Sequence, residues 1–94
     1  MTEKDILTIL KTDLQISVTA YDEYLKKIIS FAKTAIGKEG IKLDESSTEH
    51  GMLVESYAAY LYRKRKGENT SMPRSLRYAL NNELMHQKGS DSVG

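Results

Sequence analysis

The sequence has no cysteine and no long apolar run, and each absence removes a class of protein. Without cysteine there can be no disulfide, no thiolate metal site and no cysteine nucleophile. No apolar run approaches the roughly 20 residues that a helix needs to cross a bilayer. The first residues, MTEKDILTIL, lack the basic and then apolar composition of a secretion signal. We therefore expect a protein that neither spans a membrane nor is exported.

Residue patterns that support catalysis or metal binding are also missing. His50 and His86 each lack a second histidine three or four residues away. The chain has no glycine-rich phosphate loop and no GxSxG motif, and the acidic stretch DESSTE lacks the spacing and central glycine of a calcium loop. We expect no enzymatic activity, no cofactor and no metal.

Proline and glycine are few, and their positions divide the chain into helices. The single proline, Pro73, and most of the glycines lie between segments with helical period. The predicted fold is all-α, a small bundle of about four helices in one domain (residues 1–88) followed by a disordered tail (89–94). The helices are expected at about residues 3–14 after a Thr2 cap, 20–38 after a Thr19 or Ser17 cap, 49–65, and 73–86 with Pro73 in the first position.

Three of these segments have an apolar side. In the first it is formed by Ile6, Leu7, Ile9, Leu10 and Leu14. In the second, one arc holds the residues expected to form the core, with Leu25 and Ile29 fully buried: Tyr21, Tyr24, Leu25, Ile28, Ile29, Phe31, Ala32, Ala35 and Ile36. In the fourth, a stripe at i, i+4 and i+8 predicts an inward side formed by Leu76, Leu80 and Leu84. Tyr78 and Met85 fall on the opposite side. The third segment has apolar residues around so much of its circumference that it needs more than one neighbour.

Charge is unevenly distributed along the chain. Residues 1–56 have 7 lysines and 10 acidic residues, whereas residues 57–78 have 6 basic residues and a single acid, Glu68. This basic island could attract nucleic acid or an acidic protein surface. Its RKRK run, Arg63 to Lys66, also suits the negative end of a helix dipole. The tyrosines at 57, 60 and 62 could stack on bases, but such tyrosines are more often core or interface residues.

Two segments of the sequence resemble a known family. LVESYAAYLYRKRKGENTSMPRSLRYALNNEL and YDEYLKKIISFAKTAIGKEGI resemble the head-tail connector (adaptor) proteins of tailed bacteriophages and prophages, over about residues 3–88. The resemblance implies a structural virion protein, made in the bacterial host cytoplasm, that forms a ring beneath the portal and continues the DNA channel. It implies as partners other copies of the chain, the portal protein and a tail-side completion or stopper protein, with DNA only as cargo.

We expect the third and fourth helices to form the contact region. The candidate residues for an interface with other copies or with the portal are Tyr62, Arg63, Arg65, Arg74, Arg77, Tyr78 and Met85. Arg74 and Arg77 are expected to meet acidic residues of a neighbouring copy, such as those in YDEY or DESSTE. The alternative is a small helical DNA-binding regulator that uses the basic cluster 63–66, although the fourth helix offers few base-reading residues at its start.

Overall fold

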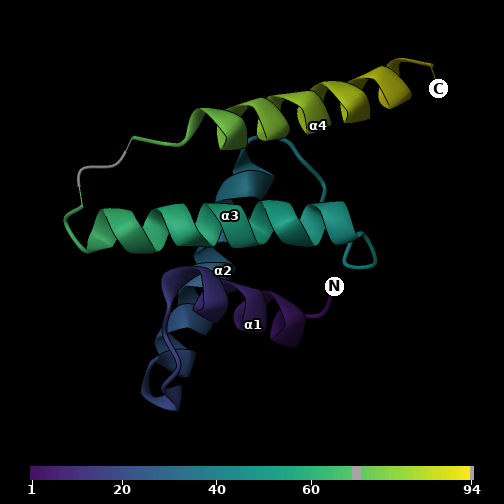
Figure 1. Cartoon of the computed structure of the whole chain (residues 1–94). Coiled ribbons are helices and arrows are strands. Elements are labelled where there is room, and N and C mark those ends of the chain that lie inside the picture. The colour runs from purple at the N-terminus through teal and green to yellow at the C-terminus, as the bar shows by residue number, and fades with distance from the viewer. Residues whose placement is uncertain (69–70, 94) are drawn as a thin grey trace.

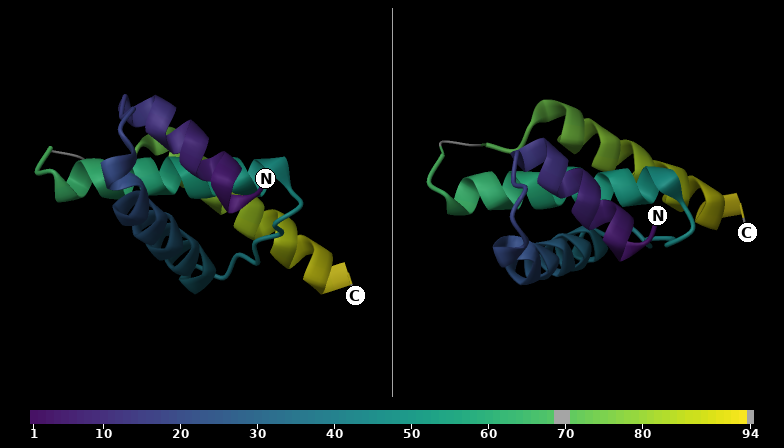
Figure 2. Two further views of the ribbon diagram at one scale, coloured as in Figure 1. Left: turned by 90° about the horizontal axis from the view of Figure 1, so that it is seen from below. Right: turned by 60° about the horizontal axis from the view of Figure 1, so that its bottom comes forward.

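The chain folds as a small bundle of helices, as predicted. The computed structural model describes residues 1–68 and 71–93, and no strand occurs among them. The elements in chain order are α1 (Glu3–Leu14), the 3-10 helix η1 (Thr19–Tyr21), α2 (Asp22–Lys38), α3 (Thr48–Arg65) and α4 (Arg74–Val93). Figure 1 shows α3 between α1 below and α4 above, with α2 crossing behind them, and Figure 2 shows the same arrangement from other sides.

Local hydrogen bonds explain where the first and third helices start. The Thr2 hydroxyl accepts from the Asp5 amide at 3.1 Å, and the Asp5 carboxylate accepts from the Thr2 amide at 2.9 Å, which is a complete capping box. Ser47 caps α3 by accepting from the His50 amide. These two caps satisfy amides that the helix itself leaves without partners.

The predicted side-chain cap of the second helix was wrong. Neither Ser17 nor Thr19 caps it, and the chain instead enters α2 through η1, with the Asp22 amide bonded to the Thr19 carbonyl. The tight 3-10 turn supplies backbone acceptors to the first amides, so no side-chain cap is needed. Pro73 lies one residue before α4 rather than inside it, and its carbonyl accepts the first helical bond from Arg77.

The core lies where α3 meets α1 and α2. Its members are Ile6, Leu7, Leu10, Leu25, Ile28, Ile29, Ala32, Ile36, Ile41, Val54, Tyr57, Ala58, Ala59, Tyr62, Leu76 and Leu80. Because α3 contacts α1, α2 and α4, it buries residues on several sides. This arrangement accounts for the wide apolar circumference seen in its sequence.

The apolar arc of α2 is only partly covered. Leu25 and Ile29 are fully buried, but Tyr21, Tyr24 and Phe31 remain 49%, 38% and 56% exposed. The sequence pattern placed all three on the buried arc. The correction has a geometric cause. Tyr24 and Phe31 lie at one edge of the arc, which the neighbouring helices leave open, whereas Ile29 at the opposite edge is buried. Tyr21 belongs to η1, before α2 starts.

Helix α4 crosses the end of α2 with its leucine stripe facing inward. Leu76 and Leu80 are buried and Leu84 is partly buried, as predicted. Gly40 follows α2 with a φ of 101°, and a Cβ there would lie 3.3 Å from Leu84 Cδ1, so only glycine suits both the turn and the contact. The helical backbone continues to Val93, beyond the predicted end near residue 86, because glycine and serine weaken a helix without breaking it. The last residue of the predicted tail, residue 94, lies outside the described residues.

Candidate interaction surfaces

The tyrosines of α3 belong mainly to the subunit's own core. Tyr57 and Tyr62 are each 9% exposed. The Tyr62 ring meets the Tyr24 ring edge-on at 6.3 Å, and Tyr57 meets Tyr60 at 5.9 Å. Tyr62 was a candidate interface residue, but its ring is covered because α2 passes beneath that side of α3. Its burial is therefore explained within one subunit.

The basic residues at the end of α3 lie over tyrosine rings. Lys64 lies 5.8 Å from the centre of the Tyr60 ring, and Lys66 lies 5.5 Å from that of Tyr62. Arg65 lies 6.0 Å from the centre of the Tyr24 ring, and its Nε donates to the Tyr24 hydroxyl at 3.2 Å. These cation–π contacts occupy ring faces that stacked bases would need.

The two arginines expected to point outward from α4 differ in their surroundings. Arg77 forms a two-bond ion pair with Glu39 at the end of α2, with distances of 2.8 and 3.2 Å. The hydrogen bond from Arg77 to Glu39 raises the pKa of Arg77 above its ordinary value. Arg77 therefore joins α4 to α2 instead of being free for a neighbour. Arg74 is exposed, and it forms no ion pair with the side chains of residues 1–68 and 71–89.

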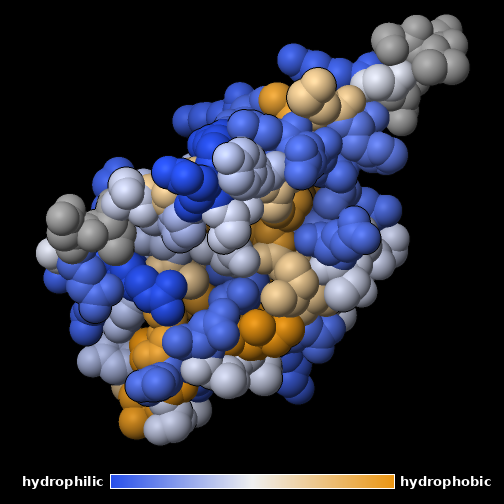
Figure 3. All heavy atoms as spheres, turned by 45° about the horizontal axis from the view of Figure 1, so that its top comes forward, coloured by the Kyte–Doolittle hydropathy of each residue, from blue (hydrophilic) through white to orange (hydrophobic). Residues whose placement is uncertain are grey.

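The outer side of α4 exposes two large apolar side chains. Tyr78 is 60% exposed and Met85 is 71% exposed, and seven residues separate them on one side of the helix. Figure 3 shows apolar atoms on this outer surface near the C-terminal end of α4, among polar neighbours. The leucine stripe attaches α4 to the body, and neither Tyr78 nor Met85 belongs to the core cluster or to the partly buried residues packed against it. Among the large apolar side chains of residues 1–68 and 71–89, these two have the highest exposed fractions.

Polar contacts fix α4 to the loop that follows α2. Gln87 accepts from the Lys42 amide at 2.8 Å and donates to the Lys42 carbonyl at 2.9 Å. His50 Nε2 lies 2.9 Å from a Glu83 oxygen, while His50 Nδ1 accepts from the Asp44 amide. Because Nδ1 accepts, Nε2 holds the proton that is donated to Glu83, and this bond lowers the pKa of Glu83. This contact could not be predicted from the sequence, because Glu83 lies 33 residues from His50.

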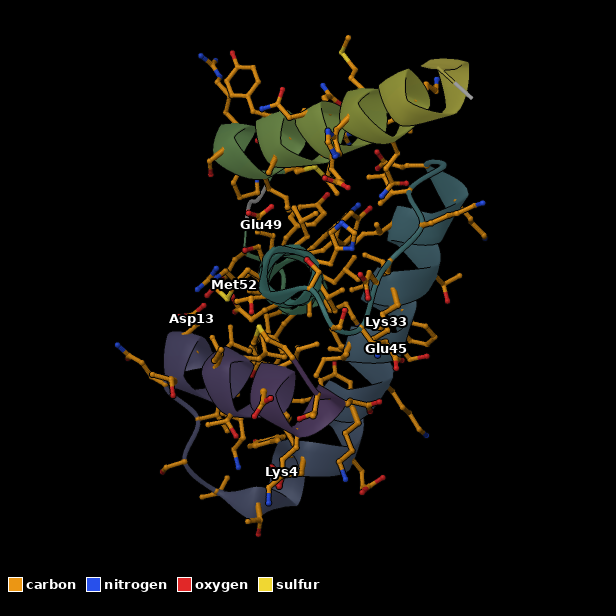
Figure 4. All side chains as sticks on the ribbon, turned by 90° about the vertical axis from the view of Figure 1, so that its right-hand side faces the viewer. Lys4, Asp13, Lys33, Glu45, Glu49 and Met52 are labelled. Atoms are coloured by element: carbon orange, nitrogen blue, oxygen red, sulfur yellow. The ribbon has the colours of Figure 1, made fainter. Side chains whose placement is uncertain are left out.

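Two hollows flank α3. A groove of about 810 Å³ between α3 and α4 includes Asp13, Glu49 and Met52 in its walls, and a hollow of about 870 Å³ near the N-terminus includes Lys33 and Glu45. Figure 4 shows these two groups of residues on opposite sides of α3. Among the described residues, no three histidine or acidic side chains come together in a metal-binding group. No helix in that part of the chain is both long and apolar enough to cross a bilayer.

Comparison with known families identifies the family of the whole chain. The model of a family described as "Phage gp6-like head-tail connector protein" matches residues 5–87. The chain belongs to this connector family. Searches of curated proteins and of solved structures give no match. The match agrees with the resemblance found in the sequence and assigns a structural role in phage particles.

This connector also contains a buried acid that the sequence pattern did not reveal. Glu55, in the middle of α3, is 2% exposed, and its Oε2 has no hydrogen-bond partner. Burial, together with a hydrogen bond to Asp13 and the charge of Asp13, raises the pKa of Glu55 to about 8, while Arg63 opposes this rise. Arg63, a candidate interface residue, is half-buried beside the groove near Asp13. The signal for Glu55 was its spacing of four and seven residues from the buried Ala59 and Tyr62.

Proposed function

We propose that this connector is one subunit of a ring of identical copies at the head-tail junction of a phage particle. The ring lies between the portal and a tail-side stopper or completion protein, and its opening continues the DNA channel. Membership of the connector family supports a position at the head-tail junction. The exposed outer side of α4 supports assembly with other chains. Subunits in a ring need surfaces that are apolar outside their own core.

The exposed pair Tyr78 and Met85 is the observation on which this proposal rests. Both side chains lie on a helix whose position is fixed by the leucine stripe, by Arg77 with Glu39, and by Gln87 with Lys42. A rigid helix that presents a large aromatic and a flexible thioether side chain suits protein contact, because little order must be gained on binding. In an isolated subunit, Tyr78 and Met85 would have no partner chain to contact.

The double substitution Tyr78→Ser with Met85→Ser tests this role. We expect the variant to keep the helical content and thermal midpoint of the parent, because both side chains are exposed. It should fail to form rings or to attach to the portal, as judged by sedimentation velocity and electron microscopy. Leu80→Ser is the matched control on the inner side, and it should unfold α4 or the domain, since Leu80 is fully buried. A double variant that melts far below the parent and still forms rings would contradict the proposal.

The DNA-binding alternative makes a different prediction. We expect the purified connector to bind duplex DNA more weakly than about micromolar at about 0.15 M salt, because non-specific phosphate contacts lose affinity steeply with salt. In addition, three of the four residues in the 63–66 cluster lie over tyrosine rings. Fluorescence anisotropy with a labelled duplex measures this affinity. Sub-micromolar binding would favour the regulator.

A further inference from the structure

Helix α4 contributes little to the core that the other helices form. Among the described residues, the core cluster takes Leu76 and Leu80 from α4, and its other members come from α1, α2, α3 and the α2–α3 connection. In Figure 1, α1 and α4 lie on opposite sides of α3. Most of the core would therefore stay packed if α4 left its place.

The contact between α3 and α4 is incompletely filled. The groove of about 810 Å³ lies between them, and two small side chains in its walls are Ala59 of α3 and Ala79 of α4. Space without protein atoms removes dispersion contacts that a close-packed seam would have. Tyr78 and Met85 are already exposed, so they lose no burial when α4 moves. The apolar attraction that holds α4 comes mainly from its leucine stripe.

Polar contacts attach α4 to residues 39–50, which follow α2 and include the start of α3. They join Arg77 to Glu39, Glu83 to His50, and Gln87 to both main-chain groups of Lys42. The side chains of Arg77 and Glu39 are 41% and 26% exposed, so water can replace their bond when α4 moves away. Contacts of this kind fix the position of α4 but add little to the free energy that holds it.

An α4 separated from the body would lose its helical structure. Asn81 and Asn82 in its middle have lower helix propensity than alanine or leucine. Most helices in proteins depend on the packing of an apolar face, and isolated helices form weakly in water. Separation would therefore expose the amides of α4 to solvent, where hydrogen exchange detects it.

We propose that α4 opens from the body as a unit while α1, α2 and α3 stay folded, and that the leucine stripe and the polar contacts with residues 39–50 hold it closed. The structure in Figure 1 is the closed form. In the open form, a minor state, the leucine stripe is exposed and Tyr78 and Met85 are no longer held on one side of a helix. Opening is a property of one subunit and does not require the proposed ring.

Native-state hydrogen exchange tests the opening. The parent is measured by NMR in low concentrations of urea, at a protein concentration at which sedimentation velocity shows a monomer. After correction for intrinsic rates, the amides of residues 80–84 should exchange at least about ten-fold faster than those of residues 28–32 in α2. They should share one opening free energy, and it should depend less on urea, because opening of α4 exposes less surface than global unfolding.

The substitution Ile6→Val separates opening from global unfolding. Ile6 is buried in α1, on the side of α3 that lies away from α4. Loss of one methylene group there should speed exchange in α2 by about two- to ten-fold. It should leave the exchange of residues 80–84 unchanged, because the contacts of Ile6 persist when only α4 opens.

Gln87→Ala is the matched variant in α4. It removes the bonds to Lys42, which are present in the closed form and absent from both the open and the unfolded states. Exchange of residues 80–84 and of residues 28–32 should therefore become faster by the same factor.

Three results would overturn the proposal. If Ile6→Val speeds both segments equally, α4 opens only when the whole subunit unfolds. If the opening free energy in the parent falls steadily from residue 80 to residue 84, the helix frays from its end and does not open as a unit. If Gln87→Ala changes neither segment, the polar contacts do not hold α4. Failure of the parent to form rings would contradict the proposed function and leave the opening intact.

Discussion

Replacing Ile29 by alanine is expected to lower the free energy of unfolding by about 2 to 5 kcal/mol. Ile29 is fully buried in α2, within the core formed with α1 and α3. Removal of its outer carbons loses their transfer free energy and leaves a cavity that rigid helices only partly fill. Leu25→Ala should act in the same way, because Leu25 is also fully buried. Urea denaturation followed by circular dichroism measures both effects.

Phe31→Ala provides the matched control on the same helix. Phe31 is larger than Ile29 and belongs to the same apolar arc of the sequence, but it is 56% exposed. Its truncation should therefore change the stability of the isolated subunit by less than about 1 kcal/mol. If Ile29→Ala and Phe31→Ala lower the free energy of unfolding equally, the buried and exposed residues of α2 have been assigned incorrectly.

The parent is expected to lose stability as pH rises, and the Glu55→Gln variant is expected not to show this loss. In the folded connector the pKa of Glu55 is raised to about 8, above its ordinary value of 4.5. Between these pH values the folded chain therefore binds more protons than the unfolded chain. The protonated Glu55 side chain therefore stabilises the folded state relative to a folded state with Glu55 ionised. This stabilisation is fully present below pH 4.5 and is lost as pH rises through about 8. Its size is on the order of 3 to 5 kcal/mol.

The difference between parent and variant isolates this effect from other titrating groups. Denaturation at about pH 5, 7 and 9 should show the Glu55→Gln variant gaining stability relative to the parent as pH rises, since an amide cannot ionise. Glu23→Gln removes the same charge from an exposed position and controls for net charge. A constant difference between the parent and Glu55→Gln across this range would mean that Glu55 is not held protonated in the folded connector.

Stability at the α1–α3 contact and assembly through α4 are separate properties in this structure. Glu55 and Asp13 join α3 to the end of α1, whereas the exposed pair Tyr78 and Met85 lies on the outer side of α4. Raising pH should therefore loosen the subunit without first removing the assembly surface. Ring formation measured at about pH 9 with Glu55→Gln and with the parent would distinguish loss of folding from loss of contact.

The sequence by itself determined the helices, the inner side of α4 and the family. These features depend on neighbours along the chain: Thr2 and Asp5 form a cap across three residues, and the leucine stripe repeats every four. Helical period fixes the angle at which each side chain leaves its own helix axis. It thus predicted that Leu80 and Met85 would lie on different sides of α4, and their exposures of 0% and 71% confirm it.

Only the tertiary structure decided which sectors of each helix are covered. The burial of Tyr62 and Glu55, and the exposure of Tyr21 and Phe31, depend on where α1 and α2 cross α3. Arg77 meets Glu39 across 38 residues of chain. A helical wheel has no information about such crossings, because it describes one axis at a time while burial and ion pairs depend on how several axes are placed together.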